Sequence, residues 1–447
     1  MNRTIDITKF PEHLGQFFYV ISPNKTAFQY EHQIPNYVND VIYLYVLFMV
    51  LEILVAKAKG KKVHRLNDGL TSYGHGLVYE TCKLFTRGFE LIGYTWLYER
   101  RFIDLDWSSP LTWWVAAIGV DFAYYWTHRL THEVNLIWAT HQVHHSSEDY
   151  NLTTAIRQSM FQRLFAVGMH QPLALLGVPL PAVIVHMHFN LLFQFWIHTE
   201  VVGDCGPLEW VFNTPSHHRV HHGANKWCLD KNYAGVLIIW DRLFGTFEPE
   251  KKDEKIVYGL VSQPQSNNVI WLQFFYFREV FNKARSMTTW SDTLKAIFYG
   301  PGWYPGTPRL GDPDALPDKT EPRPKYDPDI SNAEKAYVLG HFFVTLIIQQ
   351  ILTQQLMEFS WYTCLAYSTF ILASVGNVGA IYDGWAWAPV LEAARCIGYV
   401  AYAQKYAVFG TPALDDAVIL YFAASTLFWA SRSLGSLRLS LKTAKIE

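Results

Sequence analysis

The sequence predicts an all-α, polytopic integral membrane protein with a histidine-rich cap on the cytosolic side of the membrane. Apolar residues make up 50% of the 447 residues, whereas charged residues make up 17%, below the roughly 25% of soluble proteins. Several apolar runs are long enough to cross a bilayer as helices. Thirteen of the 18 histidines lie between residues 128 and 222. These three observations together favour a membrane protein that binds metal.

The first apolar run covers residues 41–56 and, with its flanks, is long enough to span a membrane. No cleavable signal peptide precedes it, so it is expected to be an uncleaved anchor. A basic run at a helix end is typical of the cytosolic side. Residues 1–36 are therefore expected to be lumenal, because five basic residues follow the apolar run: Lys57, Lys59, Lys61, Lys62 and Arg65.

The next apolar runs are less uniform. Residues 77–98 carry several charges, and whether they cross the membrane stays open. Residues 110–126 predict a spanning helix that contains one carboxylate, Asp121, and leads directly into the histidines. Residues 164–178 and 180–197 meet at a Pro-Leu-Pro sequence and predict a helical hairpin.

A hydrophilic region follows, because residues 199–330 contain no apolar run long enough to span. Its last part, residues 300–329, is so rich in proline that it predicts a linker. The sequence then predicts a second membrane block, with runs at 337–352, 361–380, 417–430 and, more weakly, 385–402. The expected domains are a lumenal segment (1–36), a catalytic domain with its linker (37–330, core 113–247) and a C-terminal transmembrane block (331–447).

Charge and cysteine usage exclude several classes of protein. The net charge is only −2 and no basic face recurs, which argues against nucleic acid as a partner. The five cysteines are scattered and form no C-x-x-C motif, so neither a disulfide framework nor a thiol redox motif is expected.

Eight histidines form three short motifs. His128 and His132 make H-x-x-x-H, and two H-x-x-H-H motifs follow: His141, His144 and His145, then His218, His221 and His222. Residues three and four apart share a helix face, so each motif is expected to direct its imidazoles toward one side. Imidazole suits iron, zinc, copper or nickel. Eight ligands exceed the needs of one tetrahedral zinc ion and predict two metal ions.

The histidine motifs also allow two alternatives to an enzyme. A membrane metal transporter would place its ligands inside the membrane helices, whereas the three motifs lie mainly beyond helix ends. A bis-histidine haem protein would need the spacing of His128 and His141 to recur on a second membrane helix. Isolated histidines elsewhere in the chain are expected to be structural.

The three motifs in this order, after membrane helices, resemble the fatty acid hydroxylase superfamily of integral-membrane di-iron oxygenases. The resemblance covers residues 113–247 and includes a W-D-x-x-F-G-T ending, from Trp240 to Thr246. It implies that the eight histidines bind two iron ions. The superfamily often has a further histidine about twenty residues before the last motif. His198 fills this place, twenty residues before His218, and is expected to be a ninth ligand.

Within the superfamily, residues 128–159 and the additional C-terminal membrane block most resemble the alkylglycerol monooxygenase family. That resemblance implies an enzyme of the endoplasmic reticulum membrane whose active site faces the cytosol. It implies tetrahydrobiopterin as electron donor, and O2 and a glyceryl ether lipid as substrates. Hydroxylation of the ether-linked carbon would give a hemiacetal that breaks down to a fatty aldehyde and glycerol. The alternative is a sterol or fatty acyl hydroxylase or desaturase with a cytochrome b5-type donor, although no fused H-P-G-G haem motif occurs.

Glu133 is the candidate pterin ligand, because it follows His132 directly and a carboxylate can accept two hydrogen bonds from an aminopyrimidine edge. A glutamate at this place is typical of the family that the chain resembles. The alternative is that Glu133 accepts a hydrogen bond from an imidazole N–H. Further candidates to support the histidines from behind are Asp121, Asp149, Asn151, Asn225 and Asp241, although Asp241 could instead pair with Arg242.

Overall fold

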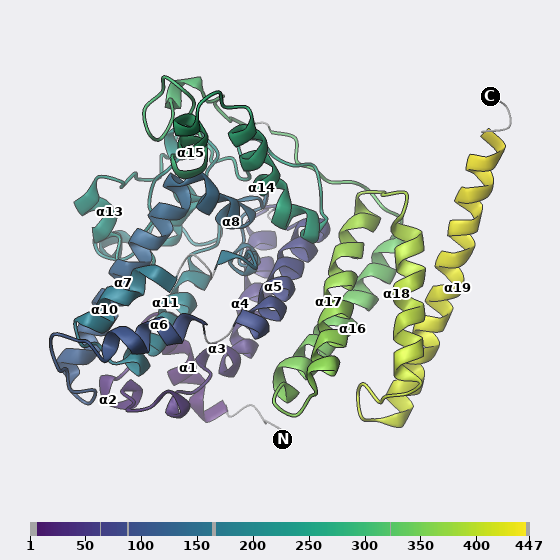
Figure 1. Cartoon of the computed structure of the whole chain (residues 1–447), viewed down its shortest axis with the longest axis horizontal. Coiled ribbons are helices and arrows are strands. Elements are labelled where there is room, and N and C mark those ends of the chain that lie inside the picture. The colour runs from purple at the N-terminus through teal and green to yellow at the C-terminus, as the bar shows by residue number, and fades with distance from the viewer. Residues whose placement is uncertain (1–6, 63, 87–88, 163–166, 322, 444–447) are drawn as a thin grey trace. The chain divides into compact units, whose positions relative to one another are not determined.

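The computed structural model describes residues 7–62, 64–86, 89–162, 167–321 and 323–443. Within these ranges the regular structure consists of α- and 3-10 helices, and the β-structure is limited to three isolated bridges. Figure 1 shows the helices along the chain. The all-α architecture predicted from the sequence is confirmed.

The chain forms two compact units. The first contains Met1–Ser72, Thr86–Pro264 and Phe274–Lys325, and the second contains Tyr73–Phe85, Gln265–Gln273 and Tyr326–Glu447. Two helices contribute residues to both units: α5 (Leu66–Thr86) and α14 (Val269–Arg285). All the histidine motifs lie in the first unit.

The first unit has twelve other described α-helices, most of them short. They are α1 (Phe10–Phe17), α2 (Pro23–Thr26), α3 (Tyr37–Asp40), α4 (Ile42–Ala58), α6 (Phe89–Tyr98), α7 (Pro110–Glu133), α8 (Asn135–His145), α10 (Gln171–Leu175), α11 (Leu180–Trp196), α12 (Pro215–His221), α13 (Ile239–Phe244) and α15 (Trp290–Phe298). The second unit has four long helices: α16 (Asn332–Gln355), α17 (Trp361–Tyr382), α18 (Ala388–Ala403) and α19 (Pro412–Thr443).

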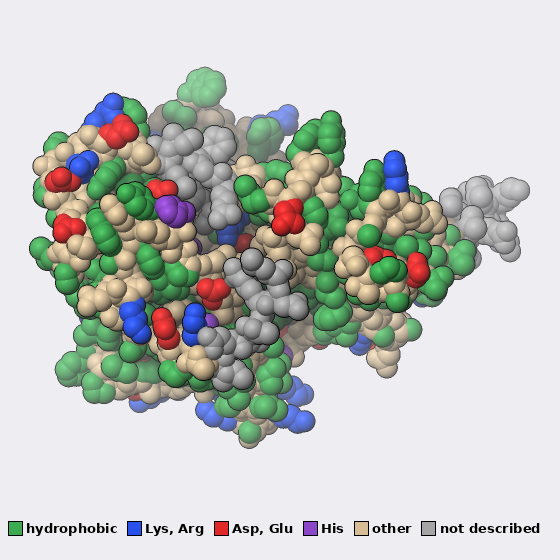
Figure 2. All heavy atoms as spheres, turned by 90° about the horizontal axis from the view of Figure 1, so that it is seen from below, with side chains coloured by type: hydrophobic (Ala, Val, Ile, Leu, Met, Phe, Trp, Pro, Cys, Tyr) green, Lys and Arg blue, Asp and Glu red, His purple; other side chains and the backbone are tan. Residues whose placement is uncertain are grey.

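Four helical stretches in the described part of the chain are long and apolar enough to cross a membrane: Glu31–Ala58, Asn332–Gln355, Trp361–Tyr382 and Pro412–Ser433. Helix α4, in the first stretch, exposes apolar side chains such as Val46 and Leu54 along its length. Hydrophobic side chains are also widespread on the face of the chain shown in Figure 2, where charged ones are scattered. The prediction of a multi-pass membrane protein is confirmed.

The span predicted at residues 110–126 differs from these four. It is helical, but α7 continues to Glu133 and contains Asp121, Arg129 and two histidines, so it lacks a sufficiently apolar length. Its exposed side chains nevertheless form an apolar stripe, Leu111, Trp114, Ile118 and Phe122. One face of α7 therefore suits an apolar surrounding, whereas its C-terminal half carries polar groups into the interior.

The predicted hairpin at 164–178 and 180–197 is only half correct. Its second arm is α11, but the first arm is a 3-10 turn (Val167–His170) followed by the short helix α10. Part of the first arm, residues 164–166, lies outside the described residues. Pro172 lies in the first turn of α10, and Gly177, just beyond its end, adopts φ +80°, a left-handed conformation that does not continue a helix. Proline and glycine therefore break the apolar run before it can form a long helix.

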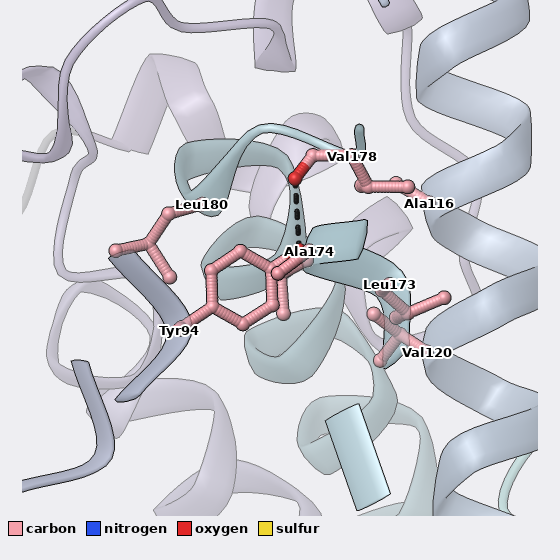
Figure 3. Packing of buried hydrophobic residues seen from close by; sticks show 8 residues of the cluster. Tyr94, Ala116, Val120, Leu173, Ala174, Val178 and Leu180 are labelled. Atoms are coloured by element: carbon pink, nitrogen blue, oxygen red, sulfur yellow. Dashed lines mark hydrogen bonds between the residues drawn. The ribbon is translucent and has the colours of Figure 1, made fainter. Parts of the chain in front are cut away.

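A compact apolar cluster packs α6, α7 and α10 against the start of α11 (Figure 3). Tyr94 of α6 donates a hydrogen bond to the carbonyl oxygen of Val178 at 2.8 Å, and Ala116 and Val120 of α7 belong to the same cluster. Gly119 allows the close approach of α10, because a Cβ at this position would lie 2.6 Å from Leu173. The cluster lies along the first half of α7, ahead of the first histidine motif.

The proline-rich stretch 300–329 is not a free linker. Its residues as far as Lys325 belong to the first unit. Arg323 donates hydrogen bonds to the carbonyl oxygens of Tyr258 and Leu260 at 3.1 and 2.7 Å. Proline restricts the unfolded chain, so a proline-rich segment can pack as an extended strap at a low cost in entropy. Composition alone did not distinguish such a strap from a linker.

Candidate metal centre

Nine histidines converge at one place in the first unit, from four helices. His128 and His132 lie on the last turns of α7, and His198 follows the end of α11. Helix α8 carries His141, His144 and His145 on its last turn and a half. Helix α12 carries His218 and His221 and is followed directly by His222. All nine side chains are buried.

The nine histidines form two groups, in each of which the potential ligand nitrogens all lie within 4.8 Å of one another. The first group contains His128, His132, His141, His145 and His221, and the second contains His144, His198, His218 and His222. We name them group A and group B. The structure therefore brings together all nine histidines that the sequence singled out.

The two H-x-x-H-H motifs divide between the groups in opposite ways. On α8 the first and last histidines belong to group A and the middle one to group B. On α12 the first and last belong to group B and the middle one to group A. Successive residues differ by about 100° around a helix axis, so the imidazoles of one motif can diverge to either side of its centre. The expectation that each motif serves one side was therefore too simple.

The separations between imidazole nitrogens suit bound metal ions. In group A, Nε2 of His128 lies 3.0 Å from Nε2 of His141. In group B, Nε2 of His198 lies 3.2 Å from that of His144 and 3.0 Å from that of His218. Two nitrogens that bind one ion at about 2.1 Å and at right angles lie roughly 3 Å apart. A shared ion explains these distances for neutral rings that face one another.

Several buried nitrogens also lack a hydrogen-bond partner. Nε2 of His132, His221 and His222 has none among the described residues. Burying such a group unsatisfied is costly, and a metal ion would satisfy it. The donor set is consistent with iron, since imidazole suits this metal and five ligands in group A exceed the four of a tetrahedral zinc site.

Burial keeps the imidazoles neutral, which is the form that binds metal. Loss of solvent lowers the pKa of His198 to about 4, although its hydrogen bond to Gln194 acts in the opposite direction. The same burial, assisted by repulsion from other histidines, lowers the pKa of His144, His145 and His222 well below the ordinary value.

Main-chain carbonyl groups orient the rings from behind. Nδ1–H of His128 donates to the carbonyl oxygen of Tyr233 at 2.7 Å, and that of His198 donates to Gln194 at 2.6 Å. His144 and His221 are held in the same way by the carbonyls of Arg157 and Lys231, at 3.1 and 2.9 Å. Such bonds fix the tautomer and leave Nε2 for the metal. No side-chain motif in the sequence marks these backbone acceptors.

Asp241 supports one of these acceptors. Its carboxylate accepts hydrogen bonds from the main-chain N–H groups of Tyr233 and Ala234, both at 2.8 Å, and from the hydroxyl of Thr246 at 2.7 Å. Burial raises the pKa of Asp241 to about 6. Arg242 instead contacts the ring of Phe247 and donates to the carbonyl of Glu209. The W-D-x-x-F-G-T ending thus shapes the loop that orients His128.

Asp121 has a similar role on the adjacent part of the same loop. It accepts hydrogen bonds from the N–H groups of Val236 and Leu237 at 2.9 and 3.0 Å, and from the indole of Trp240 at 2.9 Å. Asn190 of α11 donates a fourth, at 2.8 Å. Asp121 therefore joins α7 to the loop and to α11, behind the histidines.

The other three predicted supports act on neighbouring loops. Asp149 pairs with Arg65 at 3.0 Å and with Lys325 at 2.7 Å. Asn151 accepts a hydrogen bond from the N–H of Thr153, and Asn225 accepts one from Val257. These contacts shape the segments that follow the second and third histidine motifs. They act on the backbone rather than directly on an imidazole.

Glu133 lies at the end of α7 between two guanidinium groups. Its Oε1 accepts a hydrogen bond from Arg129 at 2.7 Å, and its Oε2 accepts one from Arg309 at 3.0 Å. Arg129 also donates to Tyr125, whose hydroxyl lies 3.0 Å from that of Thr246. Arg309 comes from the proline-rich strap, a partner that no local sequence signal indicated.

Glu52 and Arg157 are buried charged residues near group B that no sequence motif marks. Glu52, on the apolar helix α4, accepts hydrogen bonds from the hydroxyl of Thr199 and from the N–H of Leu152. Arg157 pairs with Asp68 at 2.8 Å. A carboxylate within an apolar helix was the one available signal for Glu52.

A cavity of about 1140 Å³ lies beside group B. Its lining includes Tyr150, whose ring centre lies 5.1 Å from that of His222, together with lysines of the hydrophilic region such as Lys252 and Lys255. Tyr150 therefore both lines the cavity and contacts a histidine of group B. His217 also lines the cavity and packs against Phe247, outside both groups.

Comparison with known proteins agrees with this geometry. The fatty acid hydroxylase family profile matches residues 113–246, which contain all nine histidines. The profile of the alkylglycerol monooxygenase C-terminal domain matches residues 334–415. No solved structure shows significant similarity to the chain.

Three curated relatives match over most of their length. Alkylglycerol monooxygenases of Xenopus tropicalis and Homo sapiens are each 41% identical to the chain over 423 residues, which cover 94% of both sequences. The enzyme of Caenorhabditis elegans is 33% identical over 410 residues, covering 87% of this chain and 81% of the relative. The chain therefore belongs to the alkylglycerol monooxygenase family and is an oxidoreductase of the monooxygenase class.

Proposed function

We propose that this enzyme cleaves glyceryl ethers by hydroxylating the carbon next to the ether oxygen. The observation that carries the proposal is the near full-length identity to alkylglycerol monooxygenases, combined with two buried groups of histidines. One oxygen atom of O2 enters the C–H bond, and the other leaves as water after a two-electron reduction. The product is a hemiacetal, whose C–O bond breaks to give a fatty aldehyde and glycerol.

Groups A and B would hold two iron ions, through all nine histidines. When bound, the iron ions activate dioxygen, and tetrahydrobiopterin supplies the electrons. The protein residues keep the imidazoles neutral by burial and fix their orientation through main-chain carbonyls. They also exclude water from the reacting centre, because the nine side chains and their supports are buried.

Glu133 would bind the pterin. Each carboxylate oxygen has a second lone pair beyond the one that accepts from Arg129 or Arg309. These lone pairs can accept the two parallel N–H groups of an aminopyrimidine ring while the arginines hold the carboxylate in place. Glu133 directly follows His132 of group A, so a pterin bound to it would lie beside that group.

The active site would face the cytosol, in the endoplasmic reticulum membrane. The basic run after α4 is typical of the cytosolic side. Lys59 and Lys61 of this run donate hydrogen bonds to the carbonyl oxygens of Val201 and Glu200, close to His198. The histidines thus lie on the same side as the basic end of α4. Residues 1–36 would be lumenal, 37–330 catalytic and 331–447 a membrane block.

The direct test uses the purified full-length protein in detergent with a long-chain glyceryl ether. We expect aldehyde release that requires both O2 and tetrahydrobiopterin, and iron at two atoms per chain by elemental analysis. Ether cleavage that proceeds equally with a cytochrome b5 system and without pterin would contradict the donor. Turnover of a sterol or fatty acyl substrate without ether cleavage would contradict the reaction.

A further inference from the structure

Helix α11 carries a line of polar side chains through an otherwise apolar sequence. His186, Asn190 and Gln194 lie four residues apart, and His198 continues the spacing just beyond the helix end. Residues four apart lie above one another on a helix face. His186, Asn190 and His198 are each at most 2% exposed, in an interior where unpaired polar groups are costly.

Two members of this line connect α11 to α7. Asn190 donates to Asp121 at 2.8 Å, and Gln194 donates to Asn190 at 2.5 Å. The hydroxyl of Tyr124 donates to Gln194 at 2.6 Å. The result is a continuous hydrogen-bonded chain between α7 and α11, which ends one turn before His128 on one helix and His198 on the other.

These two helices have complementary places in the metal centre. Helices α8 and α12 supply histidines to both groups, whereas α7 supplies only group A, through His128 and His132. The end of α11 supplies only group B, through His198. A fixed distance between α7 and α11 therefore fixes His198 relative to the ligands of group A.

We propose that Asn190, Gln194 and Tyr124 are positioning residues that hold His198 in place for the metal of group B. The proposal rests on the proposed function in one respect, namely that both groups bind metal. The contact is close: a Cβ at Gly235 would lie 2.8 Å from both the Asn190 amide and the Tyr124 ring. The loop that Asp121 holds thus packs directly on the chain of hydrogen bonds, and glycine leaves the room it needs.

The experiment titrates Co²⁺ into metal-free, full-length protein and follows the visible bands of imidazole-bound cobalt. Tyr124→Phe removes a single hydroxyl, and Gln194→Leu removes the interhelical amide at similar volume. Tyr94→Phe is the matched control, since it also removes one buried hydroxyl bond, in the apolar cluster of α6. Thermal unfolding of all variants is measured alongside.

We expect the wild type to bind two Co²⁺ ions. Tyr124→Phe and Gln194→Leu should lower the affinity for one of these ions about tenfold, the usual effect of losing a hydrogen bond that supports a metal ligand. The affinity for the other ion should be unchanged. The ion that binds more weakly should be the one whose binding is lost in His144→Ala. Tyr94→Phe should lower the Tm to a similar extent and leave both affinities unchanged.

Three results would overturn the proposal. Unchanged affinities in both variants, with two ions bound by the wild type, would refute the positioning role and leave metal binding intact. An equal loss of affinity for both ions in the two variants, and the same loss in Tyr94→Phe, would show that the substitutions act through general stability. A wild type that binds fewer than two ions would instead refute the proposed metal centre, and the positioning role with it.

Discussion

The imidazole of His128 is oriented by the main chain of Tyr233, whose carbonyl oxygen lies 2.7 Å from Nδ1. This bond directs Nε2 toward His141 in group A. The carbonyl is itself held by Asp241, which binds the N–H groups of Tyr233 and Ala234. A residue far along the chain from His128 thus determines how its ring faces the other histidines of group A.

Asp241→Asn should disturb group A without removing a ligand. The new amide N–H₂ would face main-chain N–H groups, so the loop that presents the Tyr233 carbonyl would shift. We expect ether cleavage to fall about 10–100-fold, the effect usual for a group that orients a metal ligand. Asp253→Asn, at an exposed position, is the matched control and should keep full activity. Full activity in Asp241→Asn would contradict the role assigned to this loop.

Single histidine variants should show that each group binds its own iron ion. His145→Ala removes a ligand of group A, and His144→Ala, its neighbour, removes one of group B. Each should bind about one iron ion per chain by elemental analysis and lose at least about 100-fold in activity. His217→Gln, adjacent to His218 but packed on Phe247, should keep both ions. Loss of iron in His217→Gln would show that the centre extends beyond the nine histidines.

Glu133→Gln should weaken the binding of tetrahydrobiopterin and leave the binding of metal unchanged. The amide offers one acceptor oxygen in place of two and no charge, and charge-assisted hydrogen bonds contribute about 1.5–3 kcal/mol. We expect the KM for tetrahydrobiopterin to rise at least about tenfold at unchanged iron content. Glu279→Gln, an exposed glutamate in the same unit, is the control. Loss of iron with an unchanged KM would indicate that Glu133 supports the histidines instead.

A buried ion pair should stabilise the second unit. Arg395 pairs with Glu392, and it also donates to Nδ1 of His341 at 2.9 Å. Arg395→Met leaves Glu392 buried without its partner, which costs about 3–5 kcal/mol in soluble proteins. The double variant Glu392→Gln with Arg395→Met should recover part of this loss in thermal unfolding. Arg432→Met, which breaks an exposed pair with Glu334, should cost less than about 1 kcal/mol.

The second unit also contains a compact group of side chains that could bind a metal ion. The C-terminal block carries no histidine motif, yet His341 lies with Glu392 and Cys396 in a compact group. Both ring nitrogens of His341 already have partners, Arg395 and Ser425. The guanidinium in this group disfavours a metal ion, so the cluster is a packing feature of α16, α18 and α19.

The sequence by itself determined the membrane class, the helical fold and which nine histidines come together. Hydropathy depends on composition and the histidine motifs depend on helical spacing, and both are properties of short stretches of chain. The break in the predicted hairpin is also local. Pro172 and Gly177 stop a long helix, although the apolar pattern of the first arm predicted one.

Only the tertiary structure decided how the histidines are shared. The same H-x-x-H-H spacing gives its middle histidine to group B on α8 and to group A on α12, so the spacing alone does not decide the group. The acceptors behind the rings are carbonyls of distant loops, and Arg309 reaches Glu133 across 176 residues. Such contacts depend on how separate segments pack, and main-chain carbonyls are the same at every position of a sequence.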